Sequence, residues 1–90
     1  MTKKEFINTG QILTASDFIK SYESSLSLTN NQIVCVYRLK MDKEPDVLFF
    51  INTTPTGQWT TTVQGKRLRS KRIENVEDKI WDFIKQNLYN

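Results

Sequence analysis

The stretch Ile33–Ile51, with the sequence IVCVYRLKMDKEPDVLFFI, decides the fold class. Its first part, Ile33 to Lys40, is rich in β-branched and aromatic residues, which favour a strand. Its last part, Val47 to Ile51, is continuously apolar, which indicates a strand that is buried on both faces and central in its sheet. The charged segment between them contains Pro45, which cannot donate to a strand ladder. The stretch therefore predicts two strands joined by a turn.

Two further strands are expected downstream. Pro55-Thr56-Gly57 has the composition of a turn. Trp59 to Gln64 then alternates large or apolar residues with polar ones, which is typical of a half-buried strand. After a second turn at Gly65, the segment Lys66 to Ile73 predicts a last strand.

Along the chain, one helix is expected before these strands and one after them. The first begins at Thr14, which has capping-box spacing to Asp17. Asn75 is expected to cap the second helix. Helical spacing places Phe18, Ile19, Tyr22 and Leu26 on one face of the first helix, and Val76, Ile80, Phe83, Ile84 and Leu88 on one face of the second. Residues 1–10 predict a short strand or an arm.

The predicted fold class is α+β, with residues 1–90 as a single domain. We expect a two-layer domain in which an antiparallel sheet of three to four strands carries an N-terminal and a C-terminal helix packed on one face. Ninety residues suffice for one modest core.

Composition narrows the setting of the protein. No apolar run approaches the length that crosses a bilayer, and the first residues lack the apolar part of a signal peptide, so we expect a cytoplasmic protein with no membrane partner. The single cysteine, Cys35, lies in an apolar run and is predicted to be a small buried residue.

The residue types disfavour most catalytic chemistry. The chain has no histidine, which excludes histidine-based nucleophile systems and leaves a zinc site without its usual ligands. Its three glycines are too far apart for a phosphate loop. Asp42, Glu44 and Asp46 are interpreted as a solvated turn, and phosphodiester cleavage by lysine, arginine and tyrosine stays open without a motif. We expect a binding protein that is no enzyme and uses no cofactor and no metal.

The positive charge is concentrated in one short segment. Cations and acids cancel over residues 1–60, and residues 74–90 carry two more acids than cations. The net charge of +3 therefore originates in five cations without an acid among them: Lys66, Arg67, Arg69, Lys71 and Arg72.

A strand over this segment has a direct consequence for its side chains. Arg67, Arg69 and Lys71 are predicted to project from one face, about 6.6 Å apart, with Leu68 directed to the core. Such a row suits phosphate contacts, and arginine adds bidentate hydrogen bonds to phosphates or guanine edges. Three alternatives remain: protection of a sheet edge, pairing with Glu74, Glu77 and Asp78, and an acidic protein partner.

A second hypothesis is a protein-interaction module, for example a small regulator or inhibitor that docks on a larger protein through the C-terminal helix. Trp81 lies at the edge of the apolar stripe of that helix and is the expected partner anchor if its ring is exposed. The oligomeric state is not predicted.

The last 45 or so residues also resemble a known class of module. Gly57-Gln58-Trp59, Val63 to Arg67 and Ile73 to Glu77 follow a pattern similar to the three-strands-plus-helix DNA-binding modules of the plant AP2 type and of phage-integrase arm domains. The resemblance implies a sheet that faces DNA and a helix packed behind it. Val47 to Ile51 is more apolar than a DNA-facing strand, and the chain has an extra helix and strand ahead of the module.

Overall fold

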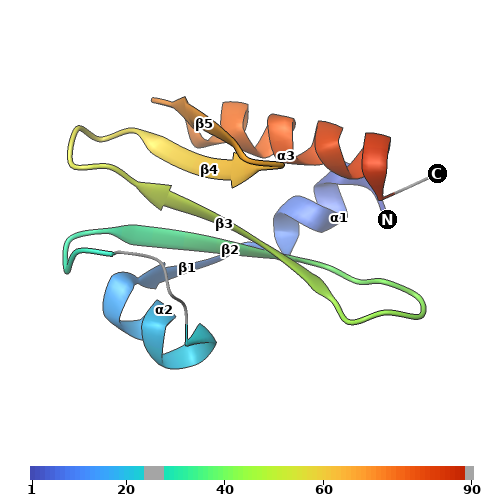
Figure 1. Ribbon diagram of the computed structural model, residues 1–90, viewed down its shortest axis with the longest axis horizontal. Helices are drawn as coiled ribbons and strands as arrows, with labels where there is room; N and C mark the ends of the chain where they lie inside the picture. Colours follow the sequence, from blue (N-terminus) through green and yellow to red (C-terminus); the bar gives the residue numbers. More distant parts are fainter. Residues whose placement is uncertain (24–27, 89–90) are drawn as a thin grey trace.

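The centre of the protein is a five-stranded antiparallel sheet in which strands follow one another in chain order (Figure 1). The computed structural model describes residues 1–23 and 28–88. The strands are β1 (Gln11–Thr14), β2 (Ile33–Leu39), β3 (Val47–Thr53), β4 (Trp59–Val63) and β5 (Lys66–Ser70), and the helices are α1 (Lys3–Asn8), α2 (Ala15–Tyr22) and α3 (Ile73–Asn87). The α+β class, the antiparallel sheet and the central position of β3 are confirmed. The fifth strand is Gln11–Thr14, which pairs with β2 and lies directly after residues 1–10, where a short strand or an arm was expected.

The sheet is buried on both faces at its centre. Side chains of β2 alternate, so that Cys35 and Tyr37 enter one core cluster and Val34 and Val36 enter another. The first and larger cluster is closed by α1 and α3, and we call its side of the sheet the α3 face. The second is closed by Phe18 of α2, and we call its side the α2 face.

The helices therefore do not all lie on one side. The helices α1 and α3 share the α3 face, whereas α2, the N-terminal helix predicted from Thr14, covers the opposite face over β1 and β2 (Figure 1). The expectation that this helix packs on the same face as the C-terminal helix is therefore wrong. The reason is the apolar character of β2 and β3 on both sides. A single helical layer would leave Val34, Val36 and Phe50 in water.

Residues 1–10 contain the helix α1 (Lys3–Asn8) in place of the expected short strand or arm. Thr2 caps α1 in a complete capping box with Glu5. The helix is held by Phe6, which is fully buried and packs against Tyr37, Phe49 and Trp81 with ring centroids 5.4, 5.7 and 5.8 Å away. Tertiary packing thus stabilises a helix that is too short to be stable by itself.

The start of α2 is confirmed. The Thr14 hydroxyl accepts the backbone N–H of Asp17 at 3.2 Å and caps the helix. The helix ends at Tyr22, because Glu23 adopts a left-handed conformation with φ of 47°. Ile19 is 43% exposed and therefore lies outside the buried stripe, and Leu26 is not among the described residues.

The expected strand Lys66–Ile73 and the expected cap at Asn75 are both wrong at the junction with α3. The strand ends at Ser70, whose Oγ accepts the backbone N–H of Arg72 at 3.2 Å and the Nδ2 of Asn75 at 2.9 Å. These bonds turn the chain so that α3 begins at Ile73. The buried residues Val76, Ile80 and Ile84 confirm the predicted apolar face of α3.

The contact between β3 and β4 is short. Their register is limited to two pairs, Asn52 with Thr60 and Thr53 with Trp59. Beyond it the strands diverge (Figure 1), and the Thr61 hydroxyl donates to the backbone oxygen of Phe50 at 2.7 Å. The backbone ladder between β3 and the β4–β5 hairpin is thus short, and packing of α3 against β2 and β3 holds the two parts of the sheet together.

Candidate functional site

The two arginines of β5 project from the α2 face of the sheet. Arg69 is paired with Thr60 and Arg67 with Thr62, and Thr60 is paired in turn with Asn52 of β3. Since cross-strand partners share a face, this row continues across the sheet to the α2 face of β2. The helix α2 packs over β1, β2 and Phe50 of β3, and both arginines of β5 are exposed.

No acidic residue occupies a strand position on this face within the described residues. Its cations are Arg38, Arg67 and Arg69. The register assigns the following residues to it: Gln11, Leu13, Val34, Val36, Arg38, Leu48, Phe50, Asn52, Thr60, Thr62, Arg67 and Arg69. We call the exposed part formed by Thr62, Arg67 and Arg69 the arginine face.

The five predicted cations are separated by the fold. Lys66 shares the α3 face with Leu68, whose side chain is partly buried as expected. Lys71 follows the last strand residue, and Arg72 is the N-cap residue of α3. The predicted row of three cations on one strand therefore consists of two, because β5 ends at Ser70.

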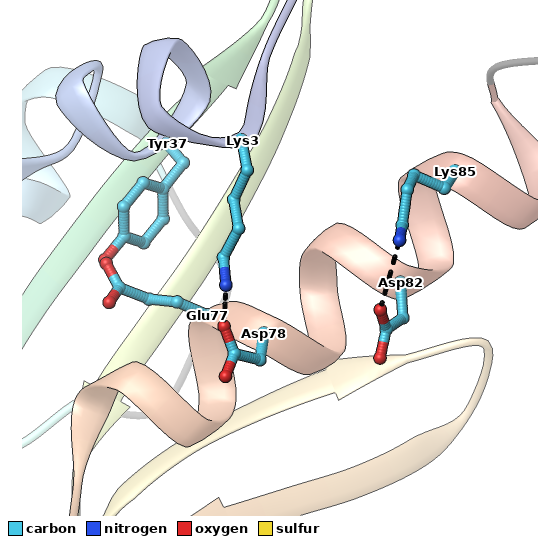
Figure 2. Close-up of polar contacts among 6 residues, drawn as sticks. All are labelled: Lys3, Tyr37, Glu77, Asp78, Asp82 and Lys85. Atoms are coloured by element: carbon cyan, nitrogen blue, oxygen red, sulfur yellow. Dashed lines mark hydrogen bonds and ion pairs between the residues drawn. The ribbon is translucent and has the colours of Figure 1, made fainter.

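The acids of α3 are engaged elsewhere. Glu77 accepts the Tyr37 hydroxyl at 2.5 Å, Asp78 pairs with Lys3 of α1, and the Asp82 carboxylate lies 3.8 Å from Lys85 (Figure 2). The carboxylate of Glu74 lies 3.7 Å from Nε of Arg72. Among residues 1–23 and 28–88, Arg72 is the one member of the basic segment with an ion pair. Arg67 and Arg69 therefore keep their charge available for an external partner.

The buried polar groups connect β2 to α3. Tyr37 is 2% exposed and donates its hydroxyl to Glu77. Burial raises the pKa of Tyr37 well above its ordinary value, and the hydrogen bonds with Cys35 and Glu77 act in the same direction. Burial also raises the pKa of the Cys35 thiol. Cys35 is buried and unbridged, as predicted, and a thiol in this state is a poor nucleophile.

Trp81 belongs to the core. Its side chain is 9% exposed, lies in the larger cluster and packs against Phe6. The condition for its role as a partner anchor, an exposed ring, is therefore not met.

The acidic turn, residues 42–46, is exposed, and one of its carboxylates pairs with Arg38 of β2. Asp42, Glu44 and Asp46 are all exposed, and the Asp46 carboxylate lies 3.8 Å from Nε of Arg38. In the part of the chain that the structure describes, no three Cys, Asp or Glu side chains cluster to hold a metal ion. No helix in the same part is long and apolar enough to cross a membrane.

Comparisons with protein-family models, with curated proteins and with solved structures give no match to this chain. Within β3, β4, β5 and α3, the helix packs on one face of the strands and Arg67 and Arg69 lie on the other. The sheet continues beyond this unit into β2 and β1.

The sequence prediction did not include Arg38 among the cations of the α2 face. The alternation of β2 contains the signal, because Arg38 follows Val34 and Val36 at a spacing of two residues. Its relation to Arg67 depends on the register of three strand pairs, which a single sequence does not specify.

Proposed function

We propose that the protein binds nucleic acid through the arginine face. The observation that carries the proposal is the combination of two exposed arginines, without ion pairs among the described residues, on a sheet face without acidic strand positions. Phosphate oxygens are the partners that this chemistry fits best, because guanidinium groups bind them with paired hydrogen bonds.

The supporting geometry is a rigid one. Arg67 and Arg69 are two residues apart on a strand, which separates their Cα atoms by roughly 7 Å. This spacing is comparable to that of neighbouring phosphates along a nucleic-acid strand, and Thr62 adds a hydroxyl beside them. A sheet can also enter a DNA groove as the reading element.

The alternative, a module that docks on a larger protein through α3, has less support. Its anchor Trp81 is in the core. The exposed acids Asp78 and Asp82 pair with cations of the chain itself. No observation on α3 favours a protein partner over solvent.

Salt-dependent binding tests the proposal. Fluorescence anisotropy with labelled duplex DNA and single-stranded RNA would be recorded at salt concentrations between about 50 and 200 mM. Each phosphate contact contributes roughly 0.9 to the slope of log K against log salt for duplex DNA. The variant Arg67→Gln/Arg69→Gln is expected to bind more weakly and to lower the steepness of this slope by about 2.

A matched variant controls for net charge. Lys4→Gln/Lys43→Gln removes two exposed cations, one from α1 and one from the turn between β2 and β3, and is expected to leave the slope close to that of the unaltered protein. Equal effects of the two double variants, or no binding at the lowest salt concentration, would contradict the proposal.

A further inference from the structure

A cavity opens on the α2 face at the end of α2. Its volume is about 320 Å³, which is within the range of small-ligand sites. Tyr22, Val36 and Leu48 provide apolar lining, and the cations Arg38 and Lys40 also line it. Its described lining contains no acidic residue.

The walls of this cavity are held in place by the fold. The Tyr22 ring is fixed by Phe18 and Phe50, with ring centroids 5.2 and 6.1 Å away. The Thr9 hydroxyl accepts the backbone N–H of Arg38 at 3.0 Å and donates to the Phe6 carbonyl at 2.6 Å. This pair of bonds fixes the strand that carries Arg38.

One of the two cations that line the cavity, Arg38, forms an exposed ion pair with Asp46. Arg38 lies 3.8 Å from Asp46, and both side chains are substantially exposed, at 54% and 39%. An ion pair of this kind contributes little and is replaced readily by a stronger anion. Lys40 is exposed and has no ion pair among the described residues.

We propose that this cavity binds a nucleotide, with the base against Tyr22, Val36 and Leu48 and the phosphate on Arg38 and Lys40. The flat apolar body of a base fits the aromatic and aliphatic lining, and the two cations require an anionic group beside it. The inference rests on the proposed function for its setting, because the cavity opens on the face that carries Arg67 and Arg69. The nucleotide is either free or an unpaired residue of the bound nucleic acid.

The first test uses adenosine monophosphate, adenosine and inorganic phosphate as separate probes, with the full chain followed by two-dimensional NMR of backbone amides. Adenosine monophosphate is expected to shift the amides of Gln11, Val36 and Leu48 and to bind at least about tenfold more tightly than either of the other two probes. Absence of these shifts at millimolar concentration, or equal binding of phosphate alone, would overturn the proposal.

Charge variants give the second test. Arg38→Gln/Lys40→Gln is expected to weaken the binding of adenosine monophosphate at least about tenfold. Asp46→Asn is expected to strengthen the binding of adenosine monophosphate about two- to fivefold, because Arg38 is released from the Asp46 carboxylate. Asp42→Asn is the control: it makes the same charge change in the same exposed turn, and Asp42 itself forms no ion pair among the described residues. An equal gain in the two aspartate variants would reduce the effect to net charge and would overturn the assignment of Arg38.

A third measurement identifies the source of the nucleotide and separates the two proposals. A duplex with one unpaired terminal nucleotide would be compared with the blunt duplex. Tighter binding of the tailed duplex, lost in Arg38→Gln/Lys40→Gln, supports a nucleotide of the nucleic acid. Equal binding of both duplexes together with binding of adenosine monophosphate supports the free nucleotide. Duplex binding by the Arg67→Gln/Arg69→Gln variant tests the arginine face, and adenosine monophosphate binding tests the cavity. Either proposal can therefore fail while the other stands.

Discussion

Tyr37 contributes both a buried ring and a polar contact to the core. Its ring stacks on Phe6, and its hydroxyl reaches across from β2 to Glu77 on α3. A hydrogen bond to a charged group contributes about 1.5–3 kcal/mol to the free energy of unfolding, because a buried acceptor without a donor is destabilising.

The first prediction concerns this bond. Tyr37→Phe keeps the ring but removes the donor, so the free energy of unfolding is expected to fall by about 2 kcal/mol. Urea denaturation followed by tryptophan fluorescence measures it. Tyr22→Phe is the matched control, since no hydrogen bond of the Tyr22 hydroxyl is formed among the described residues. A similar loss in both variants would show that the Tyr37–Glu77 bond contributes nothing specific.

In the turn between α1 and β1, the backbone at Gly10 lies very close to the Tyr37 ring of β2. A Cβ atom placed on Gly10 would lie 2.7 Å from Cε1 of Tyr37 and 3.1 Å from the carbonyl oxygen of Ile7. Neither neighbour can move freely, because one is a buried ring held by Glu77 and the other is backbone.

Gly10→Ala is therefore expected to destabilise the protein by about 1–3 kcal/mol through overpacking. Thermal and urea denaturation measure the change. Asn8→Ala, an exposed substitution two residues earlier, is expected to stay within about 0.5 kcal/mol of the unaltered protein. If Gly10→Ala were as mild as its control, the close approach to Tyr37 would not constrain this turn.

Elements with a strong local signal were predictable from the sequence. The β-branched and apolar runs predicted β2 and β3, and the Thr14–Asp17 spacing predicted where α2 begins. The helix α1 was not predicted, because six residues are too few for a periodic apolar stripe and its stability depends on Phe6 in the tertiary core. The capping box of Thr2 and Glu5 was the one available local signal.

The candidate site was predictable only in part. The alternation of a strand places Arg67 and Arg69 on one face, and the structure has them there. The end of the strand depends on bonds from Ser70 to residues of the next helix, which local propensity does not reveal, so Lys71 was wrongly placed in the same row. The addition of Arg38 depends on strand order and register across the whole sheet.

At the scale of the whole molecule, the stability of the protein is expected to depend on alkaline pH. The pKa values of Cys35 and Tyr37 are both raised in the folded state. Both groups are neutral when protonated, so their contribution is fully present below their ordinary values and is lost as the pH rises above them. Their ordinary values are about 8.5 and 10.

The free energy of unfolding is therefore expected to decrease between about pH 8.5 and pH 11, as the unfolded chain releases protons that the folded chain retains. Urea denaturation at several pH values across this range measures the slope. Tyr37→Phe is expected to show a shallower slope above about pH 10. A slope unchanged by this substitution would contradict the assignment of the alkaline loss to Tyr37.

The chain-order arrangement of the five strands also has a consequence for how the protein folds. Each strand pairs with its neighbour in the sequence, so β2 to β5 can form from successive hairpins with short connections, whereas β1 joins β2 across residues 15–32. The contacts between the chain ends, such as Phe6 with Trp81 and Lys3 with Asp78, require closure over most of the described chain. We expect these end-to-end contacts to form after the main folding barrier and to control mainly the rate at which the protein unfolds.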